Sequence, residues 1–198
     1  MKKILVVGAG CILMTGLLLS CTTQNVAEKK AQAEATRNLG EAYLRQGKYR
    51  IALMQLKKAE EMFPSDHILQ DDLGLAYLYL KEPDQAILHF KRALELKDNY
   101  TPARNNLGNA YAEKKEWDKA IEQYKMVTLD LLYGTPQFPL SNLGVVYYEL
   151  KEYELSAQYY LKALDINPEF VQALYGLTLI KIRRCRRSNS IVDVGGGR

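Results

Sequence analysis

The apolar residues of this chain fall at helical spacing within short segments, and the segments recur at an almost constant interval. A Leu-Gly pair, with a tyrosine three residues after the glycine, begins at Leu39, Leu73, Leu107 and Leu143. The first three copies are 34 residues apart, and the fourth follows after 36. At about 100° per residue, the leucine, glycine and tyrosine share one side of a helix. The pattern therefore predicts four copies of one helical unit.

Each unit is expected to contain a second helix after a short turn. In the first unit, Gly47 marks the turn, and Ala52, Leu56 and Ala59 lie on one side of the helix that follows. Pro64 then closes the unit, because a helix does not continue through proline. Small residues allow two helices to approach closely, and each pair can bury its remaining apolar face only against the next pair. The units are therefore expected to stack.

A pair of helices that repeats every 34 residues resembles the tetratricopeptide repeat (TPR). The resemblance implies an all-α fold, in which residues 31–184 form a helix-turn-helix solenoid of four repeats plus a C-terminal capping helix. That last helix is expected from Phe170 to Arg184, with Thr178 in place of the repeat glycine and Lys181 in place of the tyrosine. Residues 185–198 are basic and then glycine-rich, and they are expected to form a disordered tail. Two alternatives stay open for this tail: a native segment that binds anionic lipid or polymer, and a truncation or reading-frame artefact.

The connection between the third and fourth units is two residues longer than the period requires. It contains Gly134, Pro136 and Pro139, which interrupt a helix. An extended elbow is expected here, with Tyr133 and Phe138 held at the surface or against the neighbouring groove. A plain insertion loop is the alternative.

The first 20 residues have the features of an export signal. Lys2 and Lys3 precede Ile4–Leu19, a run without charge. This run is shorter than the roughly 20 apolar residues that span a bilayer as a helix. Residues 1–20 are therefore predicted to be a signal peptide, and a true membrane anchor is the alternative.

Leu18–Cys21 resembles the lipobox of bacterial lipoprotein signal peptides, although Leu19 is bulkier than the small residue often found there. The resemblance implies that Cys21 begins the mature chain and carries a covalent lipid such as palmitate, with no other cofactor. Several acyl chains anchor a protein stably where one does not. Thr22, where an inner-membrane lipoprotein has Asp, implies the outer membrane and a periplasmic chain, with residues 21–30 as a mobile polar tether. An ordinary cleaved signal with a chance cysteine is the alternative.

Composition fits a soluble, packed protein, with 47% hydrophobic and 25% charged residues. The formal charge of +4 comes from the leader and the tail, so the repeats are slightly acidic and carry no basic nucleic-acid footprint. His67 and His89 are the two histidines; neither lies in a metal-binding or nucleophile motif, and both are expected at the surface. No enzyme activity, metal site or small-molecule substrate is therefore expected.

One face of the first helix in each unit points away from the packed residues, and in TPR proteins that face lines a concave groove. Apolar groups on such a face favour a partner site, and Asn105 with Asn109 could hydrogen-bond an extended peptide or strand. The lysine, asparagine and arginine set with which chaperone-binding TPR domains clamp a terminal carboxylate is missing. Coverage by the tether or tail, or only partial exposure, is the alternative. The predicted partner-binding groove comprises Leu75, Leu78, Tyr79, Asn105, Asn109, Phe138, Val145 and Tyr148.

A lipobox, a short TPR array and the segment Leu132–Pro136 between the third and fourth repeats resemble the type IV pilus biogenesis lipoproteins, the pilotin family. The resemblance covers about residues 18–180. Family members help the outer-membrane secretin to localise and assemble. It implies a lipid-anchored outer-membrane adaptor that binds a protein partner, a secretin subunit, through its groove. A scaffold or regulatory subunit for other envelope or peptidoglycan-associated machinery is the alternative.

Overall fold

Helices account for nearly all of the described chain. The computed structural model describes residues 26–194, with side chains up to residue 186, and this range contains no strand. A first helix is described over residues 26–45, and the predicted all-α class is confirmed. The helices that follow are α2 (Tyr49–Met62), α3 (His67–Tyr79), α4 (Pro83–Leu96), α5 (Thr101–Glu113), α6 (Trp117–Thr128), α7 (Gln137–Glu149), α8 (Tyr153–Ile166) and α9 (Val171–Val194).

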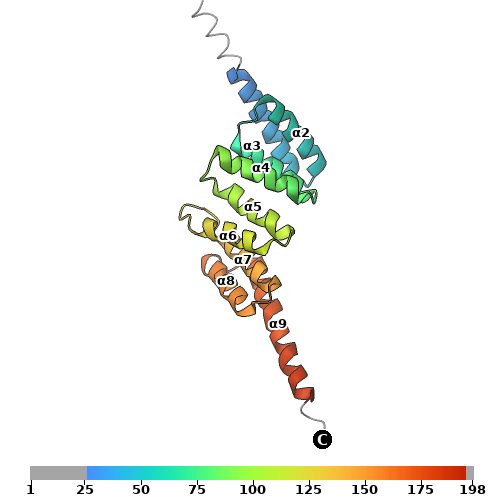
Figure 1. Cartoon of the computed structure of the whole chain (residues 1–198), viewed down its shortest axis with the longest axis vertical. Helices are drawn as coiled ribbons and strands as arrows, with labels where there is room; N and C mark the ends of the chain where they lie inside the picture. Colours follow the sequence, from blue (N-terminus) through green and yellow to red (C-terminus); the bar gives the residue numbers. More distant parts are fainter. Residues whose placement is uncertain (1–25, 195–198) are drawn as a thin grey trace, which may run out of the picture.

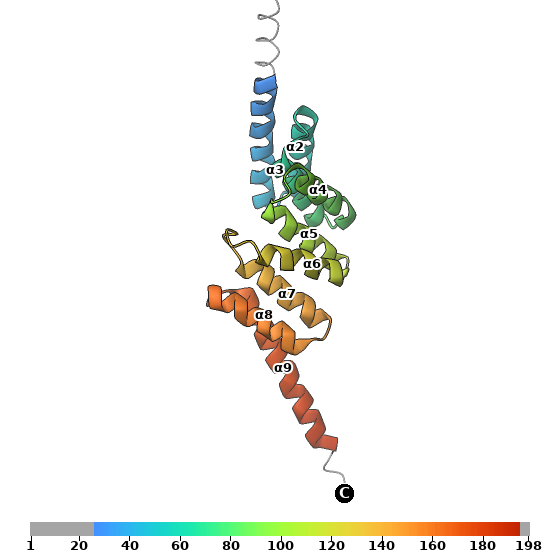
Figure 2. The same ribbon diagram turned by 60° about the vertical axis from the view of Figure 1, so that its left-hand side comes forward.

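Consecutive helices form pairs, and the pairs stack in chain order into an elongated array (Figure 1 and Figure 2). The first helix pairs with α2, α3 with α4, α5 with α6, and α7 with α8. We call the two helices of each pair helix A and helix B. The first helix and α9 lie at opposite ends, and α9 extends beyond the last pair (Figure 1). This is the predicted solenoid of four repeats plus a capping helix.

The repeat glycine lets helix A approach the large side chain of helix B. A Cβ on Gly74 would lie 2.4 Å from the Phe90 ring, and a Cβ on Gly144 would lie 2.6 Å from the Tyr160 ring. Both distances are far below van der Waals contact, so a larger residue would force the ring to move. The close contact between the two helices explains why glycine recurs at this point of every repeat.

The capping helix α9 makes the same close approach at a different residue. A Cβ on Gly176 would lie 2.2 Å from Cζ of Tyr160, so the Tyr160 ring lies between Gly144 and Gly176. Thr178, expected in place of the repeat glycine, is exposed. The repeat glycine faces helix B of its own repeat, and no such helix lies beside α9 in the described chain. Gly176 instead faces back to α8 of the preceding repeat.

The turns between helices A and B use the left-handed region of the backbone. Gly47 has a φ of 72°, and Lys81, Lys115 and Lys151 occupy the equivalent place with φ of 65°, 60° and 65°. Residues other than glycine adopt this conformation at a cost of roughly 1–2 kcal/mol. Only the first repeat has a glycine at this turn, so the other three repeats bear this cost.

The connection between α6 and α7 projects from the array as an ordered turn (Figure 1). Asp130 accepts hydrogen bonds from the hydroxyl of Thr101 and from the backbone N–H of Leu132, the latter over 3.0 Å. The side chains of Leu131 and Leu132 are 95% and 94% exposed, and Tyr133 is half-buried. The predicted interruption is confirmed, since α6 ends before this turn and α7 begins after it.

The observed helices extend beyond both predicted ends of the solenoid. Residues 26–30, expected in the polar tether, are helical, because this stretch contains several good helix formers and no glycine or proline. A disordered tail is expected after Arg184, but α9 continues to Val194, because no helix breaker occurs before Gly195. The signal peptide at residues 1–20, Cys21 and residues 195–198 lie outside the described residues. Among the described helices, none combines the length and the apolar character that a membrane span requires.

Candidate protein-binding groove

A pocket of 280 Å³ opens between the A helices of repeats three and four, and we call it the groove pocket. Helices α5, α6, α7 and the start of α9 line it. Among the predicted groove residues it contains Asn109 and Val145, the latter 37% exposed. The other lining residues are Ala112, Glu113, Trp117, Tyr124, Asn142, Val146, Glu149 and Gln172.

A chain of side-chain amides crosses the groove pocket. The amide nitrogen of Asn142 donates to Oδ1 of Asn109 over 3.0 Å, and the Tyr124 hydroxyl donates to the same oxygen over 2.8 Å. Gln172 in turn donates to Oδ1 of Asn142 over 3.3 Å. Burial raises the pKa of Tyr124, so its hydroxyl keeps its proton and its role as donor. These bonds connect α5, α7 and the capping helix α9, and they fix the positions of the two asparagines.

Two other predicted groove residues lie nearer the C-terminal end. Tyr148 lines a second pocket of 380 Å³, and its ring meets the Tyr153 ring edge-on with centroids 5.4 Å apart. Phe138 is 42% exposed at the start of α7, where its ring meets that of Phe170 at 5.1 Å. The residues that line the second pocket with Tyr148 come from α9 and are Leu179, Ile182, Arg183 and Arg186.

The three groove residues predicted in repeat two contact other side chains of the array. Leu75 is partly buried against the apolar clusters on both of its sides, and Leu78 is partly buried against one of them. Tyr79 is 50% exposed and stacks on Tyr49 with ring centroids 4.6 Å apart. None of the three lines the groove pocket. Partner binding by these residues stays a prediction.

Asn105 is buried, although it is predicted on the open groove. Its side chain is 8% exposed, and its Oδ1 is buried without a hydrogen-bond partner among the described atoms. Asp71 and Ser141, at the equivalent points of repeats two and four, are 5% and 0% exposed. This side of each A helix contacts the A helix of the neighbouring repeat. The prediction that Asn105 is accessible to a peptide is therefore wrong.

Two adjacent aspartates are buried in repeat two. Asp71 accepts a hydrogen bond from the amide of Asn106 over 3.0 Å, whereas Oδ2 of Asp72 is buried without a partner in the described structure. Burial raises the pKa of Asp71 to about 7 and that of Asp72 to about 8. Arg37 opposes the shift of Asp72 only weakly, since its guanidinium donates to Asp66 over 2.7 Å. Both carboxyl groups are therefore held partly protonated near neutral pH.

The sequence predicts both histidines at the surface, but neither of them is fully exposed. Nδ1 of His89 lies 2.7 Å from the side-chain oxygen of Gln70, and the His89 ring stacks on Tyr77 with centroids 5.3 Å apart. His67 meets the Tyr100 ring edge-on at 4.7 Å. Burial lowers the pKa of both histidines. Within residues 26–194, no group of three or more His, Cys, Asp or Glu side chains could hold a metal ion.

Sequence reasoning missed Asn142 and Gln172, which join the amide chain of the groove pocket. Both lie outside the face of helix A that was assigned to the groove from helical spacing alone. A usable signal is present, because Asn106 and Asn142 occupy the same point of repeats three and four. Each of them donates a hydrogen bond to the preceding A helix, Asn106 to Asp71 and Asn142 to Asn109.

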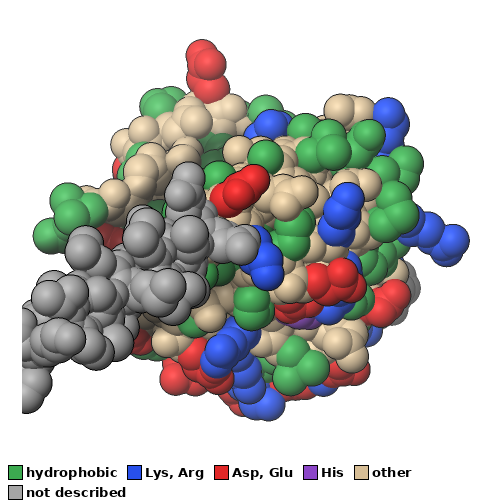
Figure 3. Space-filling view, turned by 90° about the horizontal axis from the view of Figure 1, so that it is seen from above, with side chains coloured by type: hydrophobic (Ala, Val, Ile, Leu, Met, Phe, Trp, Pro, Cys, Tyr) green, Lys and Arg blue, Asp and Glu red, His purple; other side chains and the backbone are tan. Residues whose placement is uncertain are grey.

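Charged side chains of both signs alternate with apolar ones on the end of the array seen in Figure 3. Several of the described charges form ion pairs between repeats. Lys81 lies 2.9 Å from Glu113, and Lys114 lies 2.7 Å from Asp84. In the view of Figure 3, Lys and Arg side chains are interspersed with Asp and Glu side chains, without a patch of one sign.

Comparison with known proteins gives matches to both family models and solved structures. Models described as tetratricopeptide repeat match residues 37–101, 77–131 and 139–170. The structure is similar to that of Pseudomonas aeruginosa PilF, with 23% identity and a TM-score of 0.72 over 86% of this chain and 79% of that chain. It is similar to PilW, described as a widely conserved type IV pilus biogenesis factor, with 23% identity and a TM-score of 0.71 over 76% and 69% of the two chains. No curated protein sequence matches the chain.

A third similar structure is that of YrrB, described as a TPR protein with an unusual peptide-binding site. It shares 28% identity and a TM-score of 0.64 over 74% of each chain. At their low identities, PilF and PilW show the fold alone. The family models, in contrast, match the repeats directly and together span well over half of the sequence. The chain therefore belongs to the tetratricopeptide repeat family.

Proposed function

We propose that this protein is a lipid-anchored adaptor of the outer membrane, facing the periplasm, which binds a protein partner in its groove and assists secretin assembly in type IV pilus biogenesis. Solenoids of this kind use their concave surface for binding. The observation that carries the proposal is the groove pocket, where the exposed side chain of Val145 lies beside the fixed amides of Asn109 and Asn142.

The lining of the groove pocket indicates the chemistry of the partner segment. Val145 and Trp117 offer apolar surface, and the carboxylates of Glu113 and Glu149 are exposed at the same pocket. An extended segment that places an apolar side chain on Val145 and a cationic group or backbone N–H near the glutamates would satisfy both. The pre-fixed asparagines lower the ordering cost of such binding.

Three observations support the assignment to pilus biogenesis. The fold is similar to those of PilF and PilW, and PilW is described as a type IV pilus biogenesis factor. The segment Leu132–Pro136 lies in the ordered turn between repeats three and four. The lipobox-like Leu18–Cys21 would place the chain at the membrane in which a secretin assembles.

The groove is tested by pulldown from detergent-solubilised outer membrane. Val145→Asp should abolish recovery of the secretin, because it replaces the apolar contact surface of the groove pocket by a carboxylate that an apolar side chain of the partner would have to desolvate. The matched control is Leu161→Asp, which changes a 52% exposed residue of α8 outside the groove pocket. Circular dichroism should show both variants folded. Recovery of cell-wall hydrolases in place of the secretin by the wild type would contradict the proposal.

The anchor is tested separately with Cys21→Ser. Loss of the acylated sulfur should release the protein from the outer membrane into the soluble periplasmic fraction and reduce secretin multimers. Fractionation followed by immunoblotting measures both effects. A variant that still pellets with the outer membrane and supports multimers would show that the anchoring model is wrong.

A further inference from the structure

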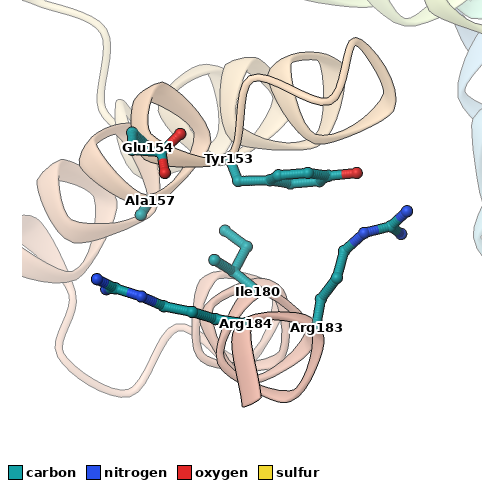
Figure 4. A pocket seen from close by; sticks show the side chains of 6 residues that line it. All are labelled: Tyr153, Glu154, Ala157, Ile180, Arg183 and Arg184. Atoms are coloured by element: carbon teal, nitrogen blue, oxygen red, sulfur yellow. The ribbon is translucent and has the colours of Figure 1, made fainter. Parts of the chain in front are cut away.

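A cleft of 780 Å³ lies at the C-terminal end of the array, between α8 and α9, and we call it the end cleft (Figure 4). Ile180 points from α9 towards α8, and the ring of Tyr153 and the methyl group of Ala157 lie opposite it (Figure 4). Arg183 and Arg184 leave α9 on either side of Ile180 (Figure 4). The end cleft therefore combines an apolar floor with two cationic edges, and Glu154 completes its lining.

The same seam exists between repeats two and three, where the turn before α6, which we call the covering turn, forms part of its lining. A smaller cavity of 310 Å³ there is lined by Asp84 and Ile87 of α4 and by Lys114 of α5. These residues occupy the same points of the repeat as Glu154, Ala157 and Arg184 of the end cleft. Both cavities therefore form where helix B of one repeat meets helix A of the next.

The covering group between repeats two and three is a carboxylate from the turn before α6. Glu116 lies 2.9 Å from the Lys114 ammonium and 2.6 Å from that of Lys119. Its hydrogen bonds with Lys119 and Lys114 lower its pKa to about 2, so it is charged. Trp117 follows directly and begins helix B. A glutamate followed by an aromatic residue recurs at Glu152, which precedes Tyr153.

At the end cleft this covering turn is replaced by continuous helix. In repeats two to four the chain reverses direction at a left-handed lysine, whereas α9 stays helical through residues 184–186. The residue equivalent to Glu116 is Arg186, so the expected carboxylate is replaced by a cation. No carboxylate of the described residues forms an ion pair with Arg183, Arg184 or Arg186. The Arg183 guanidinium instead lies over the Tyr153 ring, 4.9 Å from its centroid.

We propose that the end cleft binds the acidic first turn of a helix from a partner protein, which continues the array in place of a fifth helix B. A carboxylate of that turn pairs with Arg184, and an apolar residue of the same helix packs on Ile180 and Ala157. The chain itself supplies the template for the charged contact, because Glu116 lines the equivalent cavity and pairs with Lys114. The site is separate from the groove pocket, so the two proposals fail or succeed independently.

The test uses a fluorescein-labelled peptide of residues 116–129, which carries the covering turn and α6, added to the full chain. Fluorescence anisotropy should show saturable binding to the wild type. Arg184→Glu should weaken binding by about tenfold or more, because it replaces attraction of the peptide carboxylate by repulsion. Ala157→Trp should weaken it similarly by filling the end cleft. Both variants should retain the circular dichroism of the wild type.

Three controls make the test specific. Lys58→Glu changes an exposed cation of α2 that does not line the end cleft, and it should bind as the wild type does. Val145→Asp, in the groove pocket, should also leave peptide binding unchanged. A peptide with Glu116→Lys should bind weakly to the wild type and regain affinity for Arg184→Glu.

Two results would overturn the proposal. One is an absence of saturable peptide binding to the wild type, or equal binding to Arg184→Glu and Ala157→Trp. The other is binding of phosphatidylglycerol vesicles in place of the peptide, with loss of vesicle binding in Arg184→Glu. The second result would assign the basic side of α9 to a lipid surface.

Discussion

Replacing Gly144 by alanine tests the contact on which the repeat packing depends. The new Cβ would lie 2.6 Å from Cε1 and 2.7 Å from Cδ1 of Tyr160. The ring has no room to retreat, because Gly176 of α9 faces it from the other side, where an added Cβ would lie 2.2 Å from Cζ. Helices α7 and α9 therefore hold the ring of α8 between two backbones. Relief requires that one of these helices move.

The expected net loss follows from two opposing effects. Alanine is the better helix former and would add about 1 kcal/mol to the stability of α7. Overpacking a well-filled core costs about 1–3 kcal/mol, and a ring confined on both sides belongs at the upper end of that range. Gly144→Ala should therefore lower the free energy of unfolding by about 2 kcal/mol. In a chain of this size, that corresponds to a decrease of about 4–8 °C in the melting temperature.

The assay is urea unfolding followed by circular dichroism and by tyrosine fluorescence, with both probes because repeat arrays can unfold in stages. Gly134→Ala is the control, since nothing lies within 4 Å of a Cβ there. It should change stability by less than about 0.5 kcal/mol. Tyr160→Val removes the ring, so the double variant with Gly144→Ala should lose less than the sum of the single losses. A stable Gly144→Ala variant, or strict additivity in the cycle, would refute the steric reasoning.

Three further predictions concern a turn, a buried pair and a loop. Lys115→Gly should raise the free energy of unfolding by about 1 kcal/mol, because glycine adopts the φ of 60° without strain. The wild type should lose stability as the pH rises from about 4 to 8, because the raised pKa values of Asp71 and Asp72 mean that the folded state binds protons which the unfolded state has released. In the double variant Asp71→Asn with Asp72→Asn, the loss in free energy of unfolding over this pH range should be smaller by a few kcal/mol. Asp130→Ala should speed hydrogen exchange at the Leu132 amide, which loses its acceptor, and lower global stability by less than about 1 kcal/mol.

For each of these predictions, one experimental result would contradict it. Lys115→Ala is the control for the turn, and equal stability of the alanine and glycine variants in urea would remove strain as the cause. For the aspartates, urea midpoints across the pH range should slope downward only in the wild type, and an upward slope would reverse the assigned shifts. For the loop, exchange measured by mass spectrometry at an unchanged rate in Asp130→Ala would show that another group holds the turn.

The sequence predicted the architecture because its strongest constraint is local and steric. Gly74 must stay small since it meets the Phe90 ring, and such pairs recur with the repeat. The sequence did not show that Asn105 is buried whereas Asn109, about one helical turn away, lines the groove pocket. Which of them is buried depends on how closely the neighbouring A helix approaches, and helical spacing within one repeat does not contain that information. The left-handed backbone conformation of Lys151 could not be predicted either, because an exposed lysine gives no sign of a turn.

The groove could be predicted only in outline for the same reason. Val145 and Asn109 do meet in one pocket, since both follow the repeat glycine by one residue. Their hydrogen-bonded neighbour Gln172 comes from α9, a helix whose packing the repeat pattern leaves undefined. The acidic pair went unnoticed because the burial of Asp72 arises from packing between repeats.

The contacts between helices join elements that are neighbours or next-but-one neighbours along the chain. No helix of the described array has to wait for a distant segment before it can pack. Such a chain has low contact order, which favours rapid folding. Each helix pair can therefore pack on the preceding one as it leaves the ribosome, so that synthesis and folding proceed in the same direction.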